Sequence, residues 1–165
     1  MKVLSILKTK NVNHGGPPEV LRNQIKVIND KTNIISVLQL NYLSITFFLR
    51  CIFSKNYRLR IYNFLKKYDL VHFHEIWSLK VVLMIYFLNK LLIKHFFVGH
   101  GYIDSWSINQ KFFKKKTFIF LFLQKAFNSS SASFFSTYNE YLDVIKNIKV
   151  HDTFIIPNGV SLEKY

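Results

Sequence analysis

The strongest constraint on the fold is a regular alternation of short apolar runs with longer, partly polar runs. Six short runs have the length and composition of buried strands: residues 2–7, 34–40, 69–74, 95–98, 132–135 and 153–156. Segments with apolar positions at helical spacing lie between most of them. Because parallel strands are joined by helical crossovers, we predict an α/β fold: a doubly wound, mostly parallel, Rossmann-like sheet with helices on both faces. The length suits one domain, residues 1–165.

Two polar pairs have the spacing of a helix-capping box. Thr137 with Glu140, and Ser107 with Gln110, place a hydroxyl three residues before a Glu or Gln. The second pair predicts one long helix that extends to residue 127. Segment 44–52 is apolar and fits either a strand or a helix.

Polar and glycine-rich clusters follow four of the predicted strands. In parallel sheets, ligands bind beyond the carboxyl ends of the strands, so these clusters are the candidate site. They are Gly15-Gly16, His72-Phe73-His74-Glu75-Ile76-Trp77, Gly99-His100-Gly101 and Ile156-Pro157-Asn158-Gly159-Val160. Glycine lets a backbone approach a ligand closely, and a helix N-terminus favours negative charge. For the first and last clusters, a plain turn is the alternative interpretation.

In this order and spacing, the four clusters resemble the N-terminal domain of glycosyltransferase family 4, from Lys2 to the end of the chain. Members of that family have two Rossmann-like domains, the GT-B architecture. The resemblance implies a retaining enzyme that moves a sugar from a nucleotide-sugar to an acceptor hydroxyl in cell-envelope polysaccharide assembly. It implies no metal and no cofactor, since the nucleotide-sugar is a co-substrate.

In that family, the donor is held mainly by a C-terminal domain that carries a paired-glutamate segment. This sequence has no such segment, and Glu163 stands alone. We therefore expect the chain to be the acceptor-side N-terminal half, with the donor-binding domain absent from it and supplied in cis or in trans. Alone, it is expected to be inactive. The alternative is a non-catalytic subunit of a split transferase that binds an acceptor or a partner.

The resemblance also assigns residues. It implies that His100 lies at the reaction centre and stabilises developing charge, by a hydrogen bond or as a cation. The implied substrate-binding residues are Gly15, Gly16, His74, Glu75, Trp77, Gly101 and Asn158. A structural role is the alternative for His100, which would then pin its loop, and for Trp77, which would then be a core aromatic residue.

His72 and His74 alternate along a predicted strand and therefore share a face. Two histidines on one face are a weak metal signal, and no third ligand is evident in the sequence. We predict no metal site. The alternative for this pair is that His72 is a packed strand residue and only His74 reaches the site.

The chain is strongly basic, with 23 Lys and Arg against 9 Asp and Glu. Basic residues accompany aromatic ones in segments 57–68 and 111–123. A solvated face is one interpretation, and peripheral contact with an anionic membrane, which suits a lipid-linked acceptor, is another. Nucleic acid is not expected, because no recognition motif is present. The single cysteine, Cys51, and the absence of a long apolar stretch fit a cytoplasmic protein, peripheral at the inner membrane face.

Overall fold

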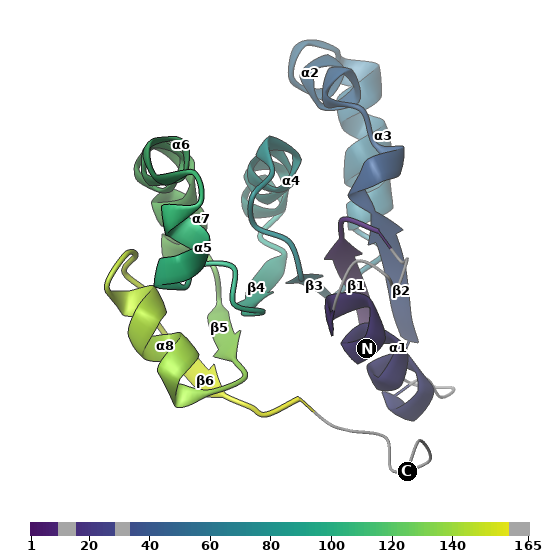
Figure 1. Cartoon of the computed structure of the whole chain (residues 1–165). Coiled ribbons are helices and arrows are strands. Elements are labelled where there is room, and N and C mark those ends of the chain that lie inside the picture. Colours follow the sequence, from purple (N-terminus) through teal and green to yellow (C-terminus); the bar gives the residue numbers. More distant parts are fainter. Residues whose placement is uncertain (10–15, 29–33, 159–165) are drawn as a thin grey trace.

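The computed structural model describes residues 1–9, 16–28 and 34–158 (Figure 1). Six strands form one sheet in which every pair is parallel, in the order β2-β1-β3-β4-β5-β6. The strands are β1 (Lys2–Leu7), β2 (Ile34–Gln39), β3 (Leu70–Phe73), β4 (Lys94–Val98), β5 (Ala132–Phe135) and β6 (Thr153–Ile155). The predicted α/β class and parallel, Rossmann-like sheet are confirmed.

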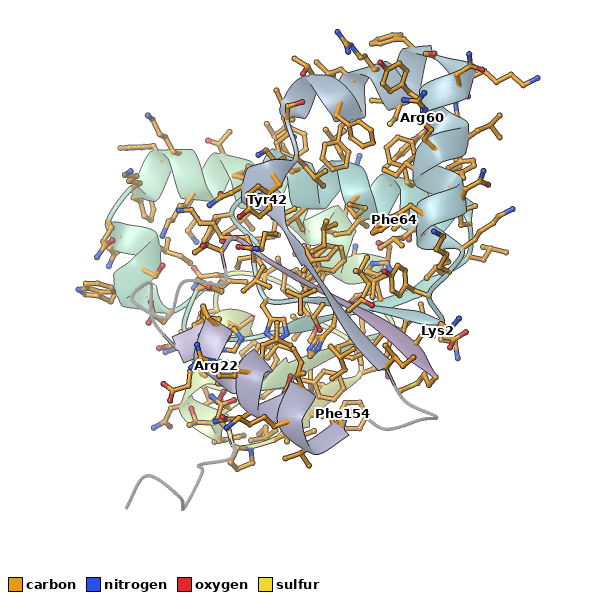
Figure 2. The ribbon with its side chains drawn as sticks, turned by 90° about the vertical axis from the view of Figure 1, so that its right-hand side faces the viewer. Lys2, Arg22, Tyr42, Arg60, Phe64 and Phe154 are labelled. Carbon is orange, nitrogen blue, oxygen red and sulfur yellow. The ribbon has the colours of Figure 1, made fainter. Side chains whose placement is uncertain are left out.

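Helices connect the strands on both sides of the sheet. They are α1 (Gly16–Ile28), the 3-10 turn η2 (Leu40–Tyr42), α2 (Ile45–Phe53), α3 (Lys55–Leu65), α4 (Leu79–Lys90), α5 (Ser105–Asn109), α6 (Phe112–Phe118), the π-helical segment η3 (Ile119–Leu123), α7 (Gln124–Asn128) and α8 (Tyr138–Ile145). Figure 2 shows α1, which carries Arg22, on one side of the sheet, and α3, which carries Arg60 and Phe64, on the other.

The sheet is built outward in two directions from β1. The β1-α1-β2 unit extends it one way, and the chain then returns so that β3 pairs with the other edge of β1. This reversal is a topological switch point, where the connections on either side of β1 and β3 diverge and leave a crevice beyond their carboxyl ends. The fold therefore indicates where a ligand would bind before any side chain is considered.

The core lies between the sheet and the helices that follow β2. Phe73, Phe97 and Phe135 point into it from three neighbouring strands, and all three are buried. Phe127 of α7 stacks on Phe97, with ring centroids 4.2 Å apart. Val144 of α8 belongs to the same cluster. This packing holds the carboxyl ends of β3, β4 and β5 in fixed register.

Helix starts agree only in part with the capping patterns. Thr137 caps α8 as predicted, since its side chain accepts from the backbone N–H of Glu140. The prediction that Ser107 caps a helix is wrong. Asp104 caps α5 instead, since its side chain accepts from the N–H of Ser107, which lies inside the helix. The long helix predicted from 107 to 127 is divided, and α6, η3 and α7 follow α5 after a break. Segment 44–52 is helical.

In the part of the chain that the structure describes, no helix is both long and apolar enough to cross a bilayer.

Candidate functional site

A cavity of about 500 Å³ lies at the switch point, beyond the carboxyl ends of β1, β2 and β3. We call it the first cavity. Its described lining residues are Leu7, Lys8, Thr9, Pro17, Pro18, Leu40, Asn41, His74, Glu75, Trp77, Ser78, Lys80 and Tyr102. The lining combines aromatic rings with one carboxylate, two lysines and several small polar groups. Such a mixture of apolar walls and a few oriented polar groups is typical of small-molecule sites.

Glu75 shapes the loop between β3 and α4. Its Oε1 accepts from the backbone N–H groups of Ile76, at 3.1 Å, and Trp77, at 2.9 Å. Ser78 then caps α4 by accepting from the N–H of Lys80. Residue Glu75 as a whole is only 8% exposed, and it lines the first cavity. It is therefore an anionic group whose orientation is fixed before any ligand arrives.

Trp77 joins two of the loops around the first cavity. Its Nε1–H donates to the backbone oxygen of Tyr102 at 2.9 Å, and Lys115 Nζ lies 4.8 Å from the ring centroid. Lys115 also donates to the backbone oxygen and hydroxyl of Ser107. The Trp77 ring packs against the core and also lines the first cavity.

Three imidazoles run across the sheet edge beside the first cavity. The ring centroids of His72 and His74 are 4.3 Å apart. His74 Nδ1 lies 3.0 Å from His100 Nε2 in a hydrogen bond, and these rings stack at 19°. His72 packs on Phe96 within the sheet, while His74 lines the cavity. The arrangement matches the alternative in which only His74 reaches the site.

Burial keeps this histidine row uncharged. It lowers the pKa of His72 to about 3, with a smaller contribution from nearby His100, and it lowers the pKa of His100 to about 4. Burial, followed by the proximity of His72 and His100, holds the pKa of His74 well below its ordinary value. At neutral pH, His100 is therefore a hydrogen-bonding group and not a cation. Of the two modes expected for it, the structure favours the first.

The histidines do not form a metal site with other residues of the described chain. Among residues 1–9, 16–28 and 34–158, no three His, Cys, Asp or Glu side chains are arranged to hold a metal ion. His72 Nε2 and His74 Nε2 are buried and have no hydrogen-bond partner among the described atoms.

A second cavity, of about 460 Å³, lies beside the first and is lined by His100. Its other described lining residues are Gly16, Pro17, Gly101, Asp104, Ser136, Thr137, Asn139, Glu140, Asp143 and Asn158. Pro17 lines both cavities. The His74–His100 hydrogen bond therefore joins a residue of the first cavity to a residue of the second. The second cavity differs in charge, since three carboxylates and no lysine or arginine are among its described lining residues.

Glu140 holds the loop that carries His100. Its Oε1 accepts from the N–H of Gly101 at 2.6 Å, and its Oε2 accepts from the N–H of Ser136 at 2.8 Å. One carboxylate thereby bridges the ends of β4 and β5. Sequence reasoning missed this role because Glu140 was already explained by its place in the capping box.

The two glycines beside His100 are required by this geometry. Gly101 has a φ of 71°, a conformation that other residues rarely adopt. A Cβ on Gly99 would lie 2.5 Å from Glu140 Oε1 and 2.8 Å from the Phe135 ring. Gly16, in contrast, opens onto space, since no described atom lies within 4 Å of where its Cβ would be.

The predicted site residues thus fall into two groups. His74, Glu75 and Trp77 line the first cavity, and His100, Gly101, Gly16 and Asn158 line the second. Gly15 lies outside the described residues. Groups that are distant in sequence are brought together, as His100 and Asn158 show.

Comparison with protein-family models gave no match, and a search of curated protein sequences also gave none.

Proposed function

We propose that this chain is the acceptor-side half of a retaining glycosyltransferase that moves a sugar from a nucleotide-sugar to an acceptor hydroxyl, in cell-envelope polysaccharide assembly. The observation that carries the proposal is the pair of cavities at the carboxyl edge of the sheet, joined by the His74–His100 hydrogen bond. Transfer between two substrates needs two adjoining sites, and the proposed reaction would take place where these cavities meet.

The first cavity is the proposed acceptor site. A sugar presents hydroxyl donors and apolar C–H faces. The fixed Glu75 carboxylate can accept from the hydroxyls, and the Trp77 ring offers an apolar surface. Lys8 and Lys80 on the same cavity suit an acceptor that also carries a phosphate, as a lipid-linked sugar does.

The second cavity is the proposed place of the sugar end of the donor. Asp104, Glu140 and Asp143 would repel a phosphate, whereas carboxylates accept hydrogen bonds from sugar hydroxyls. Cations for the donor phosphates would come from a donor-binding domain, in cis or from another chain. His100, neutral at physiological pH, would donate a hydrogen bond to the oxygen that gains charge as the bond from the anomeric carbon to phosphate breaks.

Saccharide binding to the first cavity can be tested on this chain with its own tryptophans. Trp77 and Trp106 give two indole N–H signals in a spectrum of the ¹⁵N-labelled protein, and Trp106→Phe identifies which is which. We expect titration with glucose, galactose, mannose and N-acetylglucosamine, and with their 1-phosphates, to shift the Trp77 signal saturably for at least one sugar. The exposed Trp106 should stay unchanged.

Glu75→Gln should weaken that binding roughly tenfold or more, because a hydrogen bond to a charged group contributes about 1.5–3 kcal/mol. Asp69→Asn, a carboxylate change at the far end of β3 from the cavity, is the control and should leave the affinity unchanged. The acceptor-site proposal fails if no sugar or sugar phosphate moves the Trp77 signal, or if adenosine and uridine monophosphates move it equally well.

A non-catalytic acceptor-binding or partner-binding subunit is the second candidate function. The carboxylates beside His100 favour it, since they make the second cavity a poor phosphate site on its own. The two candidates separate when the chain is mixed with a donor-binding domain and supplied with UDP-glucose or GDP-mannose. Sugar transfer that depends on His100 supports the enzyme, and saccharide binding without transfer supports the binding subunit.

A further inference from the structure

Segment α6–η3 exposes large aromatic side chains that nothing in the described chain covers. Ile119 and Leu123 are buried, but Phe113 is 83% exposed and Phe120 is 81% exposed. Leu121 is also exposed. Phe120 and Leu121 follow Phe113 by seven and eight residues, about two helical turns, so the three side chains form one outward stripe. The buried residues anchor the segment, so the stripe is held on an ordered element.

Basic side chains accompany this stripe without any acidic ones. Residues 105–128 contain five lysines and no Asp or Glu. Lys115 and Lys116 bond inward to Ser107 and Asn147. Lys111, Lys114 and Lys125 are exposed. The outer side of α6, η3 and α7 therefore combines positive charge with exposed apolar groups.

A second surface of the same character lies on α2 and α3. Residues 40–68 also contain no Asp or Glu, and they expose Phe53 together with Leu49 and Leu59. The exposed basic residues there are Arg50, Lys55, Arg58, Arg60, Lys66 and Lys67. Both surfaces belong to the helical layer on one side of the sheet (Figures 1 and 2).

Acidic residues lie elsewhere in the described chain. They are Glu19, Asp69, Glu75, Asp104, Glu140, Asp143 and Asp152, all outside the two segments. The net charge of +14 is therefore unevenly spread over the molecule, and the two carboxylate-free segments are its most basic parts. An anionic partner would be drawn to this side of the molecule.

We propose that the side formed by α2–α3 and α6–η3–α7 docks on a bilayer that contains anionic phospholipid. Lysines and arginines would lie among the headgroups, while Phe113, Phe120 and Phe53 would enter the interface. The exposed leucines favour a membrane over nucleic acid as the partner of this surface. Leu49, Leu59 and Leu121 gain nothing from a phosphate backbone or a base, whereas a membrane interface accommodates apolar side chains of any shape. The inference does not depend on the function proposed above.

Vesicle co-sedimentation of this chain tests the proposal. We expect binding to vesicles of phosphatidylcholine and phosphatidylglycerol in equal parts, and little binding to phosphatidylcholine alone. The double variant Phe113→Ser, Phe120→Ser should weaken binding roughly tenfold or more through lost apolar burial. The double variant Lys111→Gln, Lys114→Gln should weaken binding about 30-fold. Each basic residue near an anionic surface contributes about 1 kcal/mol, which is a factor of about five in affinity.

Matched controls come from α1, on the other side of the sheet. Val27→Ser removes an exposed apolar side chain there, and Lys26→Gln removes an exposed charge. Neither should change vesicle binding. All of these side chains are exposed, so each variant should keep the thermal midpoint of the parent. Phe120→Trp adds a reporter whose emission should move to shorter wavelength with anionic vesicles and be quenched by brominated lipid.

Three results would overturn the proposal. The first is no binding to anionic vesicles. The second is binding that the Phe variants leave intact, that moderate salt abolishes, and that single-stranded RNA competes away, which identifies a general polyanion surface. The third is a chain that does not bind vesicles but sediments as a dimer, and whose dimer dissociates in the Phe variants. This result would identify a contact between copies of the chain.

Discussion

Replacing Glu140 with alanine should lower the free energy of unfolding by about 2–3 kcal/mol, because the change leaves two partly buried backbone N–H groups without their charged acceptor. Those groups belong to Gly101 and Ser136, at the ends of adjacent strands. The thermal midpoint should fall by about 4–12 °C in a domain of this size. In urea, the midpoint should decrease while the slope stays constant, since the core is unchanged.

The same variant should also release the loop that carries His100. Burial holds the pKa of His100 at about 4, so a looser loop should raise this pKa toward the ordinary value near 6.5. Titration of the His100 ring protons by NMR measures the change. Loss of stability without a change in this pKa would mean that Glu140 supports the fold but does not position His100.

Asp143→Asn is the matched control for Glu140→Ala. Asp143 is a carboxylate on the same helix and lines the same cavity, but its salt bridge to Lys146 lies at the surface. Surface pairs contribute less than about 1 kcal/mol, so this variant should remain close to the parent in stability. Equal losses in the two variants would contradict the role assigned to the Glu140 bridge.

The fold was predictable because its four central strands, β1, β3, β4 and β5, bury apolar residues and its connections are helical. The runs Val3 to Leu7, interrupted only by Ser5, and Phe96 to Val98 lack the apolar–polar alternation of a half-exposed strand, which is typical of parallel sheets. Local capping patterns were less informative. Asp104 and Ser107 are three residues apart and both have cap-forming side chains, so the sequence pattern alone did not place the helix start at Asp104.

The positions of the candidate site were predictable, but its internal contacts were not. Each cluster could be placed at a strand end from sequence. The His74–His100 hydrogen bond depends on the pairing of Phe73 with Phe97, which brings the ends of β3 and β4 side by side. The bridge from Glu140 to Gly101 spans 39 residues and depends on tertiary packing. Periodicity in the sequence carries no information about either contact.

Acidification should begin to destabilise this protein before its carboxylates are neutralised, because its histidines are buried in the uncharged form. Ordinary histidine titrates near pH 6.5, while burial lowers the pKa of His100 to about 4 and of His72 to about 3. Protons therefore bind more strongly to the unfolded chain. The stability that the two uncharged, buried histidines contribute is complete above pH 6.5. It is lost progressively as the pH falls toward 4 for His100 and toward 3 for His72.

The expected loss is large relative to the stability of an ordinary domain. Between pH 7 and pH 5, each of these two histidines should cost about 2 kcal/mol of unfolding free energy. His74 and His95 are also buried, with lowered pKa values, and act in the same direction. Since domains are typically stable by about 5–15 kcal/mol, a marked loss of urea resistance at pH 5 is expected.

Urea titrations between pH 7.5 and pH 4.5 measure this dependence, and single variants show where it arises. His72→Gln removes one buried titrating group, so the fall of stability with decreasing pH should become shallower by up to about 1.4 kcal/mol per pH unit, even if the variant is less stable at pH 7. Val27→Ser, at an exposed position without a titrating side chain, should leave the slope of the parent. A parent chain equally stable at pH 7.5 and pH 5 would show that the imidazoles beside the two cavities are hydrated and able to carry charge, and His100 would then be open to a cationic role in the proposed reaction.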